Sequence, residues 1–273
     1  MRSKKGLFMK FSLKLIALIT LFSFSGLFAQ RNLSHEVGLT FGPIFMQTDY
    51  GQANHLPSST PTSFGISLSH YLSFYGSNYN WRNGSSYFSD HFKLKTDFSF
   101  YTNSDLEHKG KWAKLQNDLG DRLRAMTGTT KLWDVGMQLE YYFKNLEDYG
   151  LLFNDNDKFA PYVSTGLHFS KFTPTLTTTH NGGDYVNNPT GTLPGPWQVD
   201  AVFLEPDTTF SLTLSAGTRY KLGDVQLVLD ARWQYFFSDR IEGLDAPHEL
   251  SGSKHNDTLI FLSFGAVYDL GSF

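Results

Sequence analysis

Residues 133–143 read WDVGMQLEYYF, a stretch in which two kinds of side chain alternate along the chain. One set is large and apolar or aromatic, and the other is mostly polar or glycine: Trp133, Val135, Met137, Leu139, Tyr141 and Phe143 against Asp134, Gly136, Gln138, Glu140 and Tyr142. A period of two puts the two sets on opposite faces of a β-strand. A stretch of this length can cross a bilayer at the tilt of barrel strands, which takes roughly 9–11 residues.

The same alternation recurs in seven further stretches, at residues 36–46, 64–74, 92–100, 160–170, 210–220, 227–237 and 257–273. Each stretch has an apolar face and a face of polar residues and glycine. Eight such strands predict an all-β fold, a closed antiparallel transmembrane barrel with lipid outside and a polar interior. A soluble β-sandwich or a lipocalin-like barrel is the alternative, with the polar face turned to solvent in the sandwich.

The inward face of the predicted barrel carries four cations and five anions: Glu36, Lys93, Lys95, Asp97, Asp134, Glu140, Arg219, Asp230 and Arg232. A soluble core cannot be built from this set, which favours the membrane barrel. An eight-stranded barrel is just wide enough for side chains to fill. Because an unpaired buried charge is costly, we expect these residues to form an ion-pair network that plugs the lumen. A narrow pore for ions or small solutes is the alternative.

The connections between the predicted strands tend to alternate in length. The long ones span 47–63, 103–130, 171–208 and 239–256, whereas the sixth connection is a two-residue turn, Gly223-Asp224. An even number of strands returns the chain to the side on which it began. We therefore expect both termini in the periplasm and the long loops outside the cell.

One long loop, 103–130, has apolar residues at helical spacing: Trp112, Leu115, Leu119, Leu123 and Met126. Lys, Asp and Arg stand between them, so the pattern predicts a short amphipathic helix. Such a helix can pack on the barrel rim. Alternatively, it can dock a protein partner.

The first 29 residues are predicted to be a cleavable signal peptide, followed by a single barrel domain at 30–273. Five basic residues and no acid precede an apolar run at 15–29, as in a secretory signal. A spanning anchor needs ~20 apolar residues, which this run does not reach. No cysteine lies near the expected cut, which excludes a lipoprotein anchor.

Composition limits the possible functions of the chain. The full chain has 23 basic and 26 acidic residues; removing residues 1–29 leaves 18 basic residues, and the net charge falls from −3 to −8. Nucleic acid is therefore not an expected partner. The absence of cysteine rules out disulfides, thiol catalysis and thiolate metal sites. The mean hydropathy is −0.29 while aromatic residues reach 16%, a combination that fits strands with one face toward lipid.

The last predicted strand carries a barrel-assembly signal: Ser263, Gly265, Tyr268 and Leu270, with a terminal Phe273. Outer-membrane barrels tend to end with a polar residue, a glycine, an aromatic and an apolar residue in this order. An assembly machine pairs with this edge strand, where glycine permits close backbone approach and aromatics lie at the interface. The expected location is the outer membrane, with its lipid and the barrel-assembly machinery as partners.

Residues 231–243, ARWQYFFSDRIEG, resemble the aromatic strand and acidic-Gly turn of PorG-like barrels. The opening His35-Glu36-Val37-Gly38 and the later Asp49-Tyr50-Gly51 are similar to that family too. The resemblance implies a small outer-membrane barrel of bacteria that use type IX secretion and gliding. It implies no catalytic residues.

Enzyme signatures are absent from the sequence. The nine histidines are scattered, and no HExxH, GxSxG or P-loop occurs. His248 and His255 with Glu249 and Asp257 could form a loop metal site, but solvated loop histidines explain them as well. We predict no catalytic, cofactor-binding or metal residue. The expected function is a structural or accessory subunit that presents its loops to a protein partner, with a pore or a rim-site barrel hydrolase as alternatives.

Overall fold

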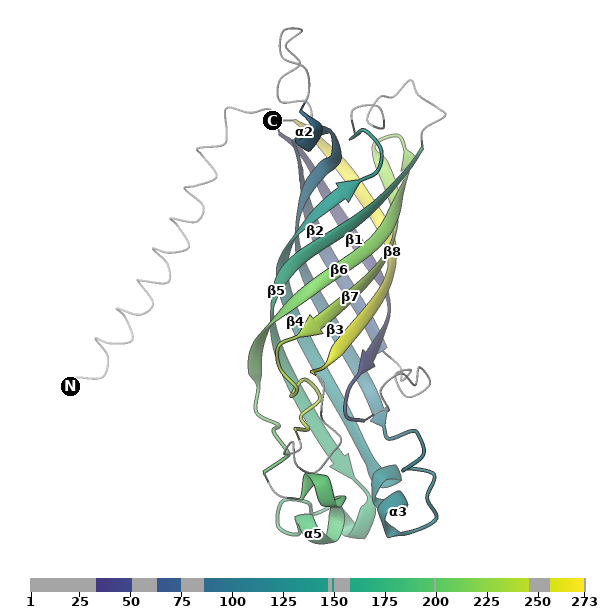
Figure 1. The fold of residues 1–273 in the computed structure, drawn as a ribbon, viewed down its shortest axis with the longest axis vertical. Helices are drawn as coiled ribbons and strands as arrows, with labels where there is room; N and C mark the ends of the chain where they lie inside the picture. Colours follow the sequence, from purple (N-terminus) through teal and green to yellow (C-terminus); the bar gives the residue numbers. More distant parts are fainter. Residues whose placement is uncertain are drawn as a thin grey trace, which may run out of the picture.

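The computed structural model describes residues 33–50, 63–74, 86–146, 149, 158–198, 200–245 and 256–272. The predicted signal peptide and Phe273 lie outside these residues. The chain forms one closed barrel in which each strand pairs antiparallel with its sequence neighbours and β8 pairs with β1 (Figure 1). The strands are β1 (Ser34–Gln47), β2 (Ser63–Ser73), β3 (Phe92–Glu107), β4 (Met126–Tyr142), β5 (Phe159–Thr178), β6 (Asp207–Leu222), β7 (Val225–Phe236) and β8 (Thr258–Ser272). The predicted eight-stranded fold is confirmed.

The register sets the size of the barrel. Following directly paired residues once around the sheet from Glu36 returns to β1 at Met46, ten residues farther along. A barrel of this strand number and stagger has an interior that side chains can fill. The structure therefore leaves room for a packed interior rather than a wide channel.

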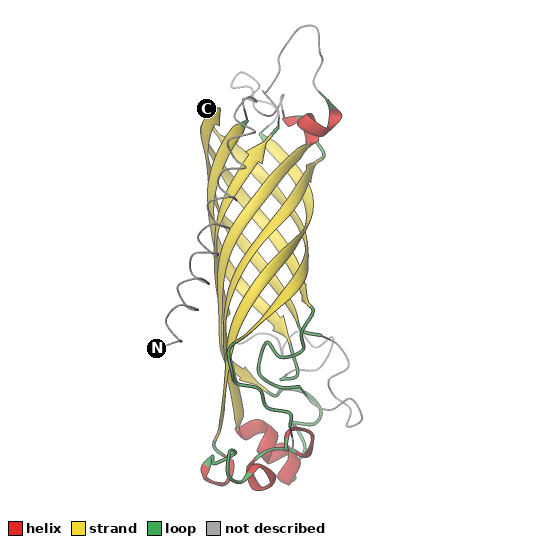
Figure 2. Cartoon of the chain, turned by 90° about the vertical axis from the view of Figure 1, so that its left-hand side faces the viewer, coloured by secondary structure: helices red, strands yellow, loops and turns green. Residues whose placement is uncertain are grey.

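The two ends of the barrel differ (Figures 1 and 2). At the terminal end, where β1 begins and β8 finishes, lies the short helix α2 (Tyr87–His91). The opposite end, the loop end, carries α3 (Asp118–Ala125), α5 (Pro189–Thr192) and the single-turn helices η3 (His180–Gly182) and η4 (Gly195–Trp197). Within the described residues, no helix is long and apolar enough to span a bilayer.

An apolar band surrounds the outside of the barrel. Along β4 and its exit, the outward side chains from Trp133 to Phe143 are all apolar or aromatic. At ~3.3 Å per residue and a tilt of ~40°, this segment spans about 25 Å, the height of the apolar band on outer-membrane barrels. Aromatic pairs lie near both borders, including Phe100–Trp133 at the loop end and Phe159–Tyr220 at the terminal end. The chain is thus an outer-membrane β-barrel.

Three strands run farther than the sequence predicts. Residues 103–107 of β3, 126–130 of β4 and 171–178 of β5 fall within predicted loops. The alternation continues in them with its polarity reversed: on β5, Phe172 and Leu176 are buried while Lys171 and Thr175 are exposed. Beyond the bilayer the outer face of a sheet meets water, so the polar residues turn outward.

The extended strands and the loop-end helices enclose an apolar core of their own, which we name the lobe. Its buried core consists of Tyr50, Leu106, Ala113, Leu123, Met126, Leu176, Leu193, Trp197, Ala201 and Leu244. The helix is shorter than the predicted run from Trp112 to Met126. The helix α3 starts at Asp118, so Trp112 and Leu115 precede it, and Met126 is the first residue of β4.

The apolar side of α3 is not free for a partner. Leu123 is buried in the lobe core and Leu119 packs against it, because the helix covers that core. Asn117 caps the start of the helix, because its side chain accepts a hydrogen bond from the Gly120 amide at 3.0 Å. Of the five residues in the predicted set, only Trp112 is an exposed large apolar side chain, at 55%.

Candidate functional site

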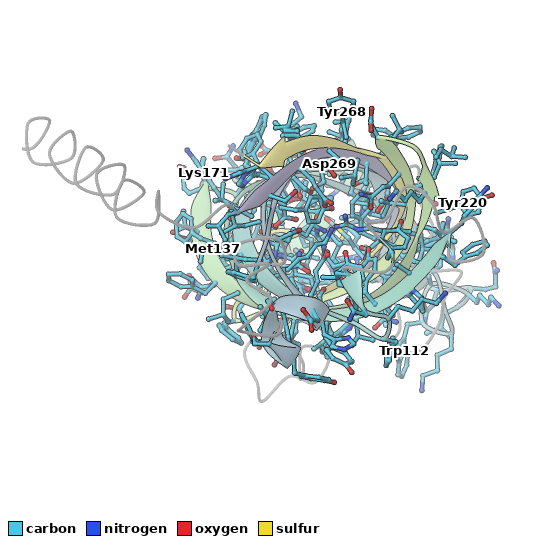
Figure 3. The ribbon with its side chains drawn as sticks, turned by 90° about the horizontal axis from the view of Figure 1, so that it is seen from above. Trp112, Met137, Lys171, Tyr220, Tyr268 and Asp269 are labelled. Atoms are coloured by element: carbon cyan, nitrogen blue, oxygen red, sulfur yellow. The ribbon has the colours of Figure 1, made fainter. Side chains whose placement is uncertain are left out.

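All nine predicted lumen charges are buried inside the barrel, which Figure 3 views from above. At the terminal end, Glu36 receives Lys93 Nζ on one carboxylate oxygen and Arg219 Nη1 on the other, each at 2.7 Å. Arg219 Nη2 also reaches Glu140 Oε2 at 3.1 Å. The guanidinium lies over the ring of Tyr71, 4.1 Å from its centroid. These contacts tie β1, β3, β4 and β6 together across the lumen.

A second group of charges fills the middle of the lumen. Arg232 forms an ion pair with Asp97 and donates to the Tyr101 hydroxyl at 2.9 Å. The Tyr162 hydroxyl donates to Asp230 at 2.7 Å. The ammonium of Lys95 lies 5.7 Å from the centroid of Tyr71, which connects the two groups.

Asp134 belongs to a buried Asp-His-Ser arrangement on β4 and β5. His168 Nδ1 and Ser170 Oγ both donate to the Asp134 carboxylate, and Gln234 donates to it at 3.0 Å. A serine nucleophile needs a histidine within hydrogen-bond reach of its own hydroxyl. Here serine and histidine share one acceptor instead, so the arrangement is a structural hydrogen-bond network.

An apolar layer closes the lumen toward the loop end, and we name it the seal. It consists of Ile44, Met46, Tyr101, Leu132, Phe172, Phe236, Ile241, Leu259 and Phe261. Ile241 comes from the connection between β7 and β8, which folds into the mouth. Its amide donates to Asp257 at 3.0 Å, and its carbonyl accepts from the Thr130 hydroxyl at 2.8 Å. The sequence predicted a plug made of ion pairs but not this second barrier.

Next to the seal, in the connection between β7 and β8 and around it, lies a group of acidic side chains that the sequence did not predict. Glu242 and Asp257 are fully buried, and Glu242 accepts a hydrogen bond from the Asp49 amide at 2.9 Å. Burial and neighbouring carboxylates raise the pKa of Asp257 to about 7 and that of Asp239 to about 8. Burial, reinforced by Asp257, raises the pKa of Glu242 well above its usual range.

This acidic group joins two of the three segments that resemble PorG-like barrels, because Asp49 belongs to residues 49–51 and Glu242 to residues 231–243. Of the predicted alternative metal set, only Asp257 is described; His248, Glu249 and His255 lie outside the described residues. Across the described part of the chain, no three His, Asp or Glu side chains are arranged to hold a metal ion.

The tip of the lobe is a structured turn. Arg124 Nη1 donates to the Leu115 carbonyl at 3.0 Å and also to the Ala113 carbonyl, which holds the turn against α3. Burial lowers the pKa of the adjacent His108 to about 3, so its ring is neutral. Trp112 projects from this turn with the ammonium of Lys111 4.7 Å from its ring centroid.

The predicted assembly signal lies along β8. Ser263 is buried on the inner face, whereas Tyr268 and Leu270 are exposed on the outer face; Figure 3 shows Tyr268 outside the wall and its neighbour Asp269 inside. A Cβ on Gly265 would lie 2.0 Å from the Leu39 carbonyl oxygen of β1. Glycine is therefore required where β8 closes against β1.

No protein-family model matches this chain, and no curated protein matches it. Solved structures with a similar fold include Neisserial surface protein A, at 12% identity and a TM-score of 0.42, covering 87% of this chain and 96% of that one. A major outer membrane protein from Thermus thermophilus has 13% identity, a TM-score of 0.48 and coverages of 87% and 99%. The outer membrane enzyme PagL has 8% identity, a TM-score of 0.33 and coverages of 86% and 97%.

Proposed function

We propose that this protein is a non-conducting outer-membrane barrel that presents the lobe to a protein partner, as a structural or accessory subunit. One observation carries the proposal: the lumen is closed by paired charges and by the seal, while three strands continue past the barrel to build the lobe. A chain that fills its channel and extends its strands outward is organised for presentation rather than for transport.

The seal argues against the pore alternative. An ion moving through the lumen would have to break the contacts of Arg219 with Glu36 and Glu140 and then cross an apolar layer, where an unpaired charge is strongly disfavoured. We expect no single-channel steps from the purified mature protein in planar lipid bilayers. Regular conductance steps would overturn the proposed non-conducting barrel.

The lobe is the surface that we propose for the partner. Trp112 is exposed on a turn that Arg124 holds in place, and exposed tryptophans are frequent anchors of protein interfaces. We expect the tagged protein to purify with a larger complex from mild detergent, and Trp112→Ala to lose that complex. Val186→Ala, which truncates another exposed side chain of the lobe, is the matched control. A monomer under every condition would contradict the proposal.

The PorG-like resemblance supports a partner within the type IX secretion and gliding machinery. We propose that deletion of the gene lowers secretion of type IX cargo, measured in the culture medium, and that the Trp112→Ala variant only partly restores it. Unchanged secretion in the deletion strain would exclude a role in type IX secretion. The pull-down would then still test whether the barrel is a subunit of another complex.

A further inference from the structure

The outward face of the barrel has an uneven distribution of charge. Apart from Glu107 at the far end of β3, Lys131 and Lys171 are the only charged side chains on the outward face of the strands, among the residues whose side chains the structure describes. They stand on adjacent strands, β4 and β5. All other outward positions in those residues are apolar, aromatic or uncharged polar.

The two lysines are close neighbours. Lys171 pairs directly with Trp133, and Lys131, two residues from Trp133, pairs with Thr173. This register makes the lysines diagonal neighbours, with Cβ atoms ~7–8 Å apart or somewhat less. Two long side chains at that separation can place their ammonium groups on one ligand.

No acid of the described residues neutralises the pair. The cross-strand neighbours of Lys131 are Thr102 and Thr173, and those of Lys171 are Trp133 and Thr208. None of the ion pairs in the described part of the chain includes either lysine. The pair is an uncompensated dication whose neighbours on the sheet are hydroxyl groups and an indole.

The level of the pair coincides with the border of the apolar band. On the terminal side of the lysines, the outward residues are Trp133, Val135 and Met137 on β4 and Phe169 and Leu167 on β5. On the loop side they are threonines. Figure 3 shows Lys171 and Met137 pointing outward from the same side of the wall. The ammonium groups therefore lie at headgroup depth, with apolar residues in line beneath them.

We propose that Lys131 and Lys171 bind the phosphate group of a membrane lipid in the leaflet at the loop end. The ammonium groups pair with the phosphate, the threonine hydroxyls donate to its remaining oxygens, and the acyl chains lie along the apolar side chains below. A lipid fits better than an acidic protein because the site is contiguous with the lipid-facing band. The site lies on the barrel wall, apart from the lobe, and does not depend on the proposed function.

The test measures lipid binding to the mature protein by native mass spectrometry from detergent micelles, with phosphorylated lipid A and its dephosphorylated form as probes. We expect the phosphorylated form to bind the wild type about 30-fold more tightly than Lys131→Gln/Lys171→Gln, the effect of two basic side chains at an anionic headgroup. The conservative Lys131→Arg/Lys171→Arg variant should retain binding. Heat-modifiable migration on gels verifies that each variant is folded.

Lys111→Gln/Lys114→Gln removes the same charge from the lobe tip and is the matched control, which should bind as the wild type does. Equal binding of the two lipid A forms would overturn the proposal, because acyl chains alone would then account for it. An equal loss in the control would also overturn it, as would full displacement of the lipid by inorganic phosphate. If the glutamine variant does not fold, loss of binding in the folded arginine variant decides against the site.

Discussion

The strand β5 passes through two environments, and its two parts bury opposite kinds of side chain. From Phe159 to Ser170 the large apolar side chains face lipid and most polar ones fill the lumen. From Lys171 to Thr177 the polar residues face outward, and Phe172 and Leu176 are buried in the seal and the lobe. Since β5 pairs with β4 in one continuous register through the change, the backbone is the same in both parts. The surrounding solvent alone decides which face is apolar.

The largest effect is expected in the lumen, where the charged side chains are buried and pair with one another. Arg219→Met leaves Glu140 and Glu36 each without one ion pair and should destabilise the barrel by about 3–5 kcal/mol, measured by urea unfolding in detergent. Adding Glu140→Gln removes one uncompensated charge and should recover at least ~1 kcal/mol. A single variant as stable as the wild type would show that the lumen is hydrated.

Substitutions of the two leucines of β5 compare the lobe core with the lipid-facing surface directly. Leu176 is 4% exposed in the lobe core, whereas Leu167 is 61% exposed toward lipid. Leu176→Ala should cost about 3–4 kcal/mol because a cavity remains, and limited proteolysis should cut the lobe first. Leu167→Ala should cost about 1–2 kcal/mol, because acyl chains fill the space. Equal costs for the two variants would contradict the change of environment at Lys171.

A third prediction concerns pH and the acidic group between the two regions. The folded-state pKa values of Asp257 and Glu242 are raised, so the folded protein holds more protons than the unfolded chain from about pH 4 to about pH 7 and above. Stability should therefore fall as the pH rises through that window. Glu242→Gln should reduce the loss of unfolding free energy between pH 5 and pH 8, by on the order of 1–3 kcal/mol. Asp184→Asn, at an exposed carboxylate, is the control and should follow the wild type.

The smallest effect is expected for an ion pair on the outside of the lobe. Arg122 Nε and Asp118 Oδ2 form an ion pair at 2.7 Å, but the Asp118 side chain is 68% exposed. Because water can replace the arginine there, Asp118→Asn should cost no more than about 0.5 kcal/mol. The measurement is the thermal unfolding of the lobe, monitored through its sensitivity to a protease. A loss of stability comparable to that of Arg219→Met would mean that burial does not determine how much an ion pair contributes in the lumen and in the lobe.

The reversal of the apolar face at Lys171 also explains which parts of the fold can be predicted from the sequence. An alternating pattern with its apolar face toward lipid predicts the strands within the bilayer and the charges that line the lumen. The predicted strand ends at Ser170, before the charged Lys171, although β5 continues to Thr178. The seal and the acidic group could not be predicted, because Ile241 and Glu242 occupy a connection and their partners Thr130 and Asp49 lie more than 100 positions away.

The unbroken pairing of β4 with β5 has a mechanical consequence. All of β4, from Met126 to Tyr142, is hydrogen-bonded in register to β5, and the lobe is mounted on the outer ends of these strands. A pull on the lobe along the barrel axis moves β3, β4 and β5 together and loads in shear the ladders that join them to β2 and β6, so the hydrogen bonds of these ladders share the force rather than breaking one by one. The lobe is thereby a handle through which a moving partner can transmit tension to a barrel held in the membrane.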